Sequence, residues 1–200
     1  MKKHFIIVFG ALLMFAYSSK AQSTVGEFSW QASLPTGDFS DFIEKVNALG
    51  LNFQGRWYLK NDRTSVGGSL SYFYFQDKKG KQTIATPEGG AFTGDITNFT
   101  NIYGLQAIIQ QDLKPKDQKT VPFIRAGAGG AYQDQRTYTG IYELQNDGFQ
   151  FMGNAEAGVR IGDKVKSIVL AATWHYLPAS GDMVSTSFFG IKLGISYFKY

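Results

Sequence analysis

Residues 49–59, LGLNFQGRWYL, alternate apolar side chains with glycine and polar side chains. Successive side chains of a β-strand point to opposite faces, so this segment has one apolar face and one small, polar face. Residues 148–161 and 186–200 repeat the alternation. These three segments predict strands of a sheet whose two faces lie in different surroundings.

Five further segments share this pattern, which makes eight strands, near residues 24–34, 48–60, 64–76, 98–112, 120–133, 148–161, 166–177 and 186–200. The connections at 61–63, 114–119 and 162–165 are short, whereas those at 35–47, 77–97 and 134–147 are long and 178–185 is intermediate. Short turns on one rim and long loops on the other are typical of outer-membrane barrels. The sequence predicts an all-β fold, a closed eight-stranded antiparallel transmembrane β-barrel with both termini on the periplasmic rim.

The first 21 residues have the pattern of a secretory signal peptide. Lys2 and Lys3 precede an apolar run from Phe5 to Tyr17, and a small residue, Ala21, ends the segment. The run is shorter than the ~20 residues of a spanning helix, which disfavours a membrane anchor. Cleavage after Ala21 leaves residues 22–200 as one barrel domain. This domain keeps 17 of the 20 basic residues and all 16 acidic residues, a net charge of +1. This near-neutral balance removes the argument for a nucleic-acid partner.

Composition excludes several classes of site. The 200 residues contain 23 glycines, 16% aromatic residues and no cysteine, which disfavours an all-helical fold and excludes disulfides, thiolate metal sites and a lipidated cysteine. Only two histidines are present, so a multi-histidine metal centre is not expected. The sequence indicates neither a cofactor nor a metal.

The polar face of the strands is rich in glycine, serine, asparagine and glutamine, including Gly67, Ser69, Ser71, Gly104, Gln106, Gly127 and Gly129. A solvated face would carry more Lys and Glu, whereas small residues suit a narrow lumen filled by side chains. The apolar face is then expected to contact lipid. The alternative is a soluble periplasmic barrel of the lipocalin kind, with the apolar face inward.

Aromatic residues gather at the strand ends, as at the two interfaces of a membrane. The outer group consists of Tyr72, Tyr74, Tyr132, Trp174 and Tyr176, and the inner group of Trp57, Tyr197 and Tyr200. This depth pattern favours the membrane barrel, although aromatic residues are also common in ordinary strands.

Charged residues at lumen-facing positions form the strongest candidate for a functional constellation. They are Glu27, Arg56, Arg125, Glu156, Arg160 and Lys192. Buried ions must be paired, and Arg125 and Glu156 lie at matching positions on neighbouring strands, so a cross-strand pair is expected. The network either fills and fixes the barrel or forms the selectivity element of a narrow pore.

Catalysis has weak support. Some small outer-membrane barrels modify lipid A with a histidine and a serine near the outer rim, and His175, Ser180 and Asp182 lie in the corresponding part of this chain. Their spacing matches no lipid-deacylase motif, and a nucleophile, base and orienting group need mutual hydrogen-bond reach. His175 is expected to be an inward-facing structural residue.

The strand patterns at 49–59, 121–132 and 190–198 resemble those of the small outer-membrane β-barrel proteins of the OmpX, OmpA and OmpW kind, particularly the Bacteroidetes-type versions. The resemblance covers the whole mature chain and rests on barrel patterns, so it supports the fold better than the function. It implies contact with outer-membrane lipid and insertion by the outer-membrane assembly machinery, which reads a terminal aromatic such as Tyr200. Tyr200 is out of phase with the lipid-facing residues before it, which predicts a bulge or a frayed end.

The expected function is that of a non-enzymatic outer-membrane protein of a Gram-negative cell with a filled lumen. A protein or glycan partner is expected, if anywhere, at the 77–97 and 134–147 loops. The alternatives are a narrow, porin-like path for ions or small solutes, an accessory subunit of a secretion or gliding complex, and, less favoured, a lipid A modifying enzyme.

Overall fold

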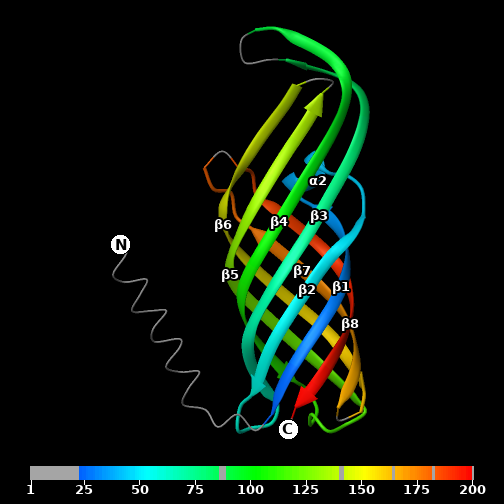
Figure 1. Cartoon of the computed structure of the whole chain (residues 1–200), viewed down its shortest axis with the longest axis vertical. Coiled ribbons are helices and arrows are strands. Elements are labelled where there is room, and N and C mark those ends of the chain that lie inside the picture. The colour runs from blue at the N-terminus through cyan, green and yellow to red at the C-terminus, as the bar shows by residue number, and fades with distance from the viewer. Residues whose placement is uncertain (1–22, 86–88, 140–141, 164, 182, 200) are drawn as a thin grey trace, which may run out of the picture.

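The computed structural model describes residues 23–85, 89–139, 142–163, 165–181 and 183–199. Its elements are β1 (Thr24–Thr36), α2 (Asp38–Phe42), β2 (Asn47–Tyr58), β3 (Thr64–Ala85), β4 (Ala91–Asp112), β5 (Thr120–Thr139), β6 (Tyr142–Gly162), β7 (Lys166–Leu177) and β8 (Thr186–Lys199). Each strand is antiparallel to the next, and β8 pairs with β1 (Figure 1). The eight strands form a closed barrel, as the sequence predicts.

The register of the strands sets the width of the barrel. Paired residues followed from Thr24 through all eight strands return to β1 at Leu34, ten residues further along, so the shear number is ten. With a rise of about 3.4 Å per residue and about 4.8 Å between strands, the strands tilt by about 42° and the backbone lies about 8 Å from the axis. Side chains fill an interior of this width.

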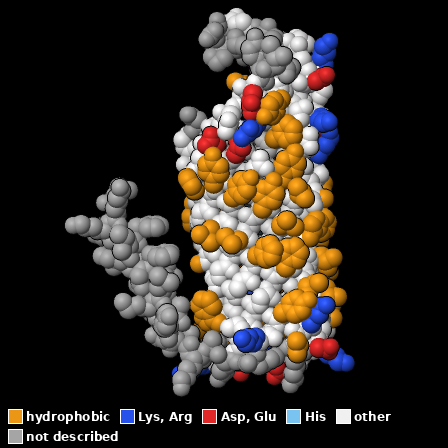
Figure 2. Space-filling model, in the orientation of Figure 1, with side chains coloured by type: hydrophobic (Ala, Val, Ile, Leu, Met, Phe, Trp, Pro, Cys, Tyr) orange, Lys and Arg blue, Asp and Glu red, His pale blue; other side chains and the backbone are white. Residues whose placement is uncertain are grey.

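The two faces of the sheet have the polarity expected for a membrane barrel. Phe53, Leu105, Ile109, Ile191, Leu193 and Ile195 are exposed on the outside, and Leu51 is half-buried there. Asn52, Arg56, Gln106, Glu156 and Lys192 are buried inside. Exposed apolar side chains occur on all eight strands, and Figure 2 shows one side of this band. The alternative of a soluble barrel, with these residues in a common interior, is wrong.

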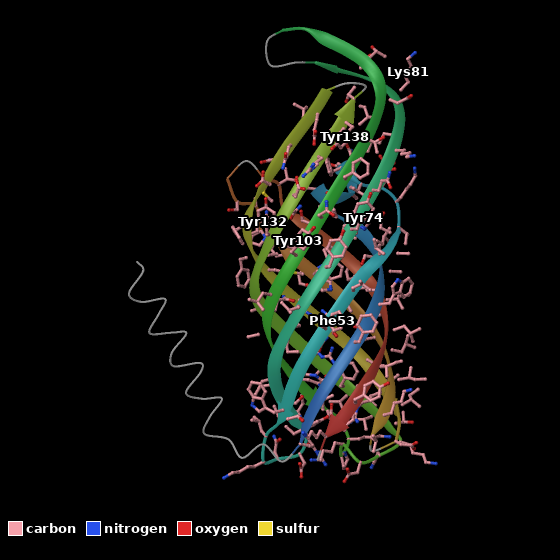
Figure 3. The ribbon with its side chains drawn as sticks, viewed as in Figure 1. Phe53, Tyr74, Lys81, Tyr103, Tyr132 and Tyr138 are labelled. Atoms are coloured by element: carbon pink, nitrogen blue, oxygen red, sulfur yellow. The ribbon has the colours of Figure 1, made fainter. Side chains whose placement is uncertain are left out.

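Tyrosines form a row on the outside of the β3–β6 wall. Tyr72, Tyr103, Tyr132 and Phe149 occupy directly paired positions on successive strands, and their neighbouring rings lie 5.1, 6.5 and 5.2 Å apart (Figure 3). Further along, the outward positions are mostly polar, although Phe99 contacts Tyr74 and Tyr138 there, and the Tyr132 hydroxyl donates to Asp147. This row therefore marks the outer edge of the lipid-facing band.

The predicted loops at 77–97 and 134–147 are wrong in most of their length. β3 and β4 stay paired as far as Ala85 and Ala91, and β5 and β6 as far as Thr139 and Tyr142. Backbone pairing continues because each strand has a partner for its hydrogen bonds, and this pairing does not depend on whether lipid or water contacts the outward side chains. The extended hairpins make the barrel taller on the β3–β6 side (Figure 1).

The two rims differ as the connections predict. Ser23 and Lys199 lie at the same end as the turns at 59–63 and 113–119, and the short helix α2 lies at the opposite end (Figure 1). The end of β8 is regular. Its pairing with β1 continues through Lys199, so the described part of this strand lacks the expected bulge, and Phe198 faces inward. Tyr200 and the expected signal peptide fall outside the described residues. Among the described residues, no helix is long and apolar enough to cross a membrane.

Candidate functional site

All six sequence-predicted charged residues lie inside the barrel and are at most 5% exposed. Five of them, Glu27, Arg56, Arg125, Glu156 and Lys192, come from five different strands and meet in one layer. Each occupies the inward phase of its strand, and the narrow radius of the barrel brings their long side chains together across the axis. The layer closes the middle of the lumen with ion pairs.

Arg125 is the centre of this layer. Its Nη1 donates to Glu156 Oε2 at 2.8 Å and to Glu27 Oε1 at 3.1 Å, and its Nη2 donates to Glu27 Oε2 at 2.9 Å. Its Nε and Nη2 also donate to Gln110 Oε1. Arg125 and Glu156 are directly paired residues of β5 and β6, as the sequence analysis expects. The planar guanidinium thus holds two carboxylates on opposite sides of the barrel.

Arg56 and Lys192 complete the pairing. Arg56 Nη2 donates to Glu27 Oε2 at 2.8 Å, and Lys192 Nζ donates to Glu156 Oε1 at 2.5 Å. Glu156 also accepts from Asn154 Nδ2 at 3.1 Å. Every carboxylate of the layer therefore contacts at least two donors, which offsets the cost of removing the charges from water.

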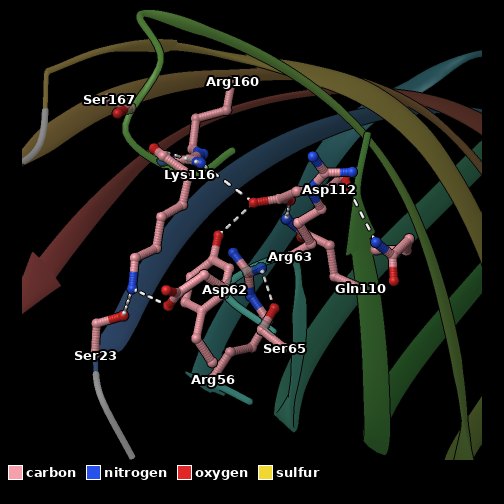
Figure 4. A network of polar contacts seen from close by, with 12 residues as sticks. Ser23, Arg56, Asp62, Arg63, Ser65, Gln110, Asp112, Lys116, Arg160 and Ser167 are labelled. Carbon is pink, nitrogen blue, oxygen red and sulfur yellow. Dashed lines mark hydrogen bonds and ion pairs between the residues drawn. The ribbon is translucent and has the colours of Figure 1, made fainter. Parts of the chain in front are cut away.

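Arg160, the sixth predicted residue, belongs to a second network nearer the periplasmic end (Figure 4). Its Nη2 donates to Asp112 Oδ2 at 3.3 Å, and Asp112 also accepts from the Tyr58 hydroxyl and from Gln110 Nε2. Gln110 joins the two networks because its amide oxygen accepts from Arg125. Sequence reasoning missed Asp112, although it has the inward phase of Gln106 and Gln110 on the same strand.

Lys116 closes the periplasmic end of the lumen. Its Nζ pairs with Asp62 at 2.5 Å, donates to Ser23 at 3.1 Å and lies over the Tyr58 ring at 5.3 Å (Figure 4). Arg160 similarly stacks over the Phe198 ring at 4.4 Å. Lys116 lies in a turn, where no periodicity indicates the direction of a side chain, so this contact could not be predicted from the sequence.

An apolar layer fills the outer part of the lumen, where the sequence analysis expected small and polar residues. Its buried members are Phe39, Ile43, Phe73, Phe75, Ile102, Ala131, Met152, Leu177 and Phe188. Phe73 and Phe75 continue the inward phase of Ser69 and Ser71, so the phase predicts their direction, but the expected composition of the lumen is wrong for this layer. The apolar layer fills the lumen further out than the ion pairs.

The helix α2 forms a lid on this layer. Phe39 is fully buried, and its ring meets Phe75 edge-on at 5.1 Å. Gly37 precedes the helix at φ 60° and ψ −146°, a conformation that favours glycine, and turns the chain back over the mouth. A helix of five residues has no stability of its own in water, so packing and tertiary hydrogen bonds hold the lid in place.

Polar contacts fasten the lid to β3 and, through Asn98 Nδ2 donating to the Phe42 carbonyl at 2.7 Å, to β4. Asp77 accepts from the backbone N–H of Glu44 at 3.0 Å and pairs with Lys45 Nζ at 3.0 Å. Lys79 pairs with Glu44 at 3.2 Å and donates to the backbone carbonyl of Asp41. Burial alone would raise the pKa of Asp77, but the hydrogen bond from Glu44 and the charge of Lys45 hold this pKa below its ordinary value. The ionised carboxylate is therefore the anchor of the lid.

His175 lies inside, at the border of the ion layer and the apolar layer. Its ring stacks on Phe188 at 4.7 Å and meets Phe73 at 4.9 Å, and neither ring nitrogen has a hydrogen-bond partner among the described residues. Ser180 is exposed and pairs through its backbone with Met183, and Asp182 falls outside the described residues. The structure does not bring His175 and Ser180 together. Within the described ranges, no group of three or more His, Asp or Glu residues forms a metal site.

The β3–β4 hairpin continues past its neighbours as a free ribbon. β2 pairs with β3 no further than Tyr74, and β5 pairs with β4 no further than Ile96. Beyond these points, both edges of the ribbon formed by residues 80–85 and 91–95 lack a neighbouring described strand. Lys78 and Lys81 are exposed at its base. A two-stranded ribbon with open edges presents backbone groups to another chain.

Comparison with known proteins places this geometry in a class. No family model and no curated protein matches the chain. Among solved structures, Neisserial surface protein A matches with a TM-score of 0.52 and 8% identity over 88% of this chain and 95% of that one. Ail of Yersinia pestis has a TM-score of 0.49 and 13% identity, and the N-terminal barrel domain of Pseudomonas aeruginosa OprF has 0.43 and 13%; each match covers 88% of this chain and 97% of the other.

At these identities the likeness concerns the fold. The chain has the fold of the small eight-stranded outer-membrane β-barrel proteins. Its exposed apolar band and its filled, ion-paired interior fit a barrel surrounded by lipid, and we therefore place the protein in the outer membrane.

Proposed function

We propose that the protein is a non-enzymatic outer-membrane barrel that presents the β3–β4 ribbon and the β5–β6 hairpin to a protein or glycan partner. The single observation that carries this proposal is the free ribbon, whose two edges have no neighbouring described strand. The side chains in the lumen stabilise the strands that carry the ribbon and the hairpin. The ion pairs and the α2 lid hold the β3–β6 wall from the inside.

The contents of the lumen argue against a pore. The Arg125 layer crosses the middle of the barrel, and the side chains of Arg125, Glu27 and Glu156 are at most 1% exposed. Phe39, Phe75 and Phe188 cover the same axis further out, and Lys116 covers the periplasmic end. An ion would have to displace all three layers. We expect no large steady conductance from the purified protein in planar bilayers.

A ribbon deletion tests the binding role. Replacing residues 82–94 with Asn-Gly joins Lys81 and Asp95, which are directly paired, through a two-residue hairpin turn. The barrel should remain folded, as checked by its heat-modifiable migration in gel electrophoresis. Cross-linking in outer membranes of the native host should then lose a partner that the full-length protein captures.

A matched variant separates the two partner classes. Lys78→Gln with Lys81→Gln keeps the backbone of the ribbon and removes two exposed charges. A protein that adds a strand to the ribbon should still bind this variant, whereas an anionic glycan, assayed by salt-dependent retention on heparin, should not. Equal capture by the full-length protein and the deletion would contradict the proposal.

Each alternative function, a pore, an enzyme or an accessory subunit, predicts a different experimental result. A stable ion-selective current that Glu156→Gln abolishes would favour a pore. Altered lipid A that returns to normal in His175→Ala would favour an enzyme. Co-purification with a secretion or gliding complex, together with such genes beside this one in a Bacteroidetes-type genome, would favour an accessory subunit. Each result would replace the binding role with a different class of function.

A further inference from the structure

The periplasmic rim carries a ring of exposed cations. Lys60, Arg63, Lys114, Lys119, Lys166 and Lys199 are exposed, and none forms an ion pair with a described residue. The described acidic residues of this rim are fewer: Asp117 and Asp163 are exposed, and Asp62 is engaged by Lys116. The rim therefore has a net positive charge spread around its circumference.

These cations lie at the depth of lipid headgroups. Lys60 and Lys114 follow the exposed Leu59 and Leu113 at the periplasmic ends of β2 and β4, and Lys166 is the first residue of β7, next to the exposed Val165 of the preceding turn. Lys166 Nζ also lies 5.6 Å from the centre of the Tyr197 ring, which is half-exposed on the lipid face. An ammonium group at the edge of the apolar band can reach the phosphate layer of a bilayer.

The opposite rim shows that this charge is not a general property of the surface. There Lys45 pairs with Asp77, Lys79 with Glu44, and Arg136 with Asp134 and Glu143. Lys78 and Lys81 also lack an ion pair with a described residue, but they lie close together at the base of the β3–β4 ribbon. The periplasmic cations lie beside every turn of their rim and at the end of β8, so they form a ring. Its position at the membrane surface selects an anionic lipid over a soluble partner.

We propose that the periplasmic rim binds the headgroup phosphates of anionic phospholipids, such as phosphatidylglycerol, in the inner leaflet of the outer membrane. Each lysine contributes a point charge at the headgroup layer, and the low-dielectric barrel beside it strengthens the attraction. The ring gathers an annulus of anionic lipid around one end of the barrel. This inference does not depend on the role of the outer ribbon.

Lipid selectivity measures the proposed binding directly. The full mature protein is folded into phosphatidylcholine vesicles, and spin-labelled phosphatidylglycerol or phosphatidylcholine reports by electron paramagnetic resonance which lipid is held at the protein surface. We expect phosphatidylglycerol to associate about three- to five-fold more strongly at low salt, with the preference falling as the salt concentration rises. Both leaflets contain the probe, so the orientation of insertion does not affect the result.

Two matched double variants locate the effect. Lys114→Gln with Lys166→Gln should reduce the preference by at least half, whereas Lys78→Gln with Lys81→Gln removes the same charge from the other end and should leave it unchanged. Both variants should keep heat-modifiable migration, because none of these side chains forms an ion pair with a described residue. Equal association of the two lipids, or a preference lost in the outer variant alone, would overturn the proposal. Sedimentation with peptidoglycan sacculi that requires Lys114 and Lys166, without lipid selectivity, would assign the rim to the cell wall instead.

Discussion

The pair Glu156–Lys192 offers the sharpest test of how the lumen is stabilised. Lys192 is fully buried, and Glu156 is the only hydrogen-bond partner of its ammonium group among the described residues. Glu156→Gln leaves Lys192 as a buried cation without its ion-pair partner, and we expect a loss of about 3–5 kcal/mol in the free energy of unfolding.

Lys192→Met should cost less, about 1–3 kcal/mol, because Glu156 keeps Arg125 and Asn154 as donors. The double variant removes both charges and leaves Glu27 with Arg56 and Arg125. We expect its loss to be at least about 2 kcal/mol smaller than the sum of the two single losses.

Urea unfolding from lipid vesicles gives the three free energies, followed by the fluorescence of the three tryptophans, which lie on the lipid-facing side. The control combines Glu156→Gln with Lys166→Gln. Lys166 is exposed and lies outside the ion-pair network, so the losses of these two substitutions should add. Single losses that add to the double loss within about 0.5 kcal/mol would refute the reasoning, because the two charges would then not depend on each other.

Three further predictions concern the surface and the lid. Leu193→Arg, on the lipid face, should cost about 2–4 kcal/mol near mid-bilayer by the same unfolding assay, and a loss no larger than that of Leu193→Ala would contradict the lipid contact. Phe39→Ala should open the lid without unfolding the barrel, seen as faster hydrogen exchange over residues 38–45 with unchanged heat-modifiable migration. The pKa of Asp77 is lower in the folded protein, so its contribution is present above its ordinary value and is lost as the pH falls through the folded pKa. Exchange of the Glu44 amide, corrected for its intrinsic pH dependence, should therefore rise on acidification, and Asp77→Asn should abolish this change.

The period of two in the sequence was enough to predict the barrel and much of its site. Side chains of a strand alternate between the inside and the outside of the barrel. Once one face is assigned to lipid, the direction of every side chain in the strand is therefore assigned as well. Arg125 and Glu156 could be paired from the sequence because they lie on adjacent strands, at equal distances from the 134–147 connection between them. Local pattern and chain order determine neighbours of this kind.

Contacts across the axis needed the tertiary structure. Glu27 on β1 meets Arg125 on β5 because the barrel closes with a shear of ten, and no local pattern encodes which inward residues share a height. Asp112 was in phase but was not recognised as a partner of Arg160, and Lys116 lies in a turn without a phase.

At the outer end of the barrel, too, the sequence predicts the direction of the side chains but not their tertiary contacts. The alternation around residues 73–75 fixed the direction of Phe73 and Phe75, but the sequence alone did not show that α2 folds over them, since a five-residue helix has no periodicity to detect. The sequence predicts a loop at 77–97 because the alternation of apolar and polar residues stops where the outward side chains leave the lipid. Backbone pairing does not require lipid, so the strands continue, and only the tertiary structure showed where they end.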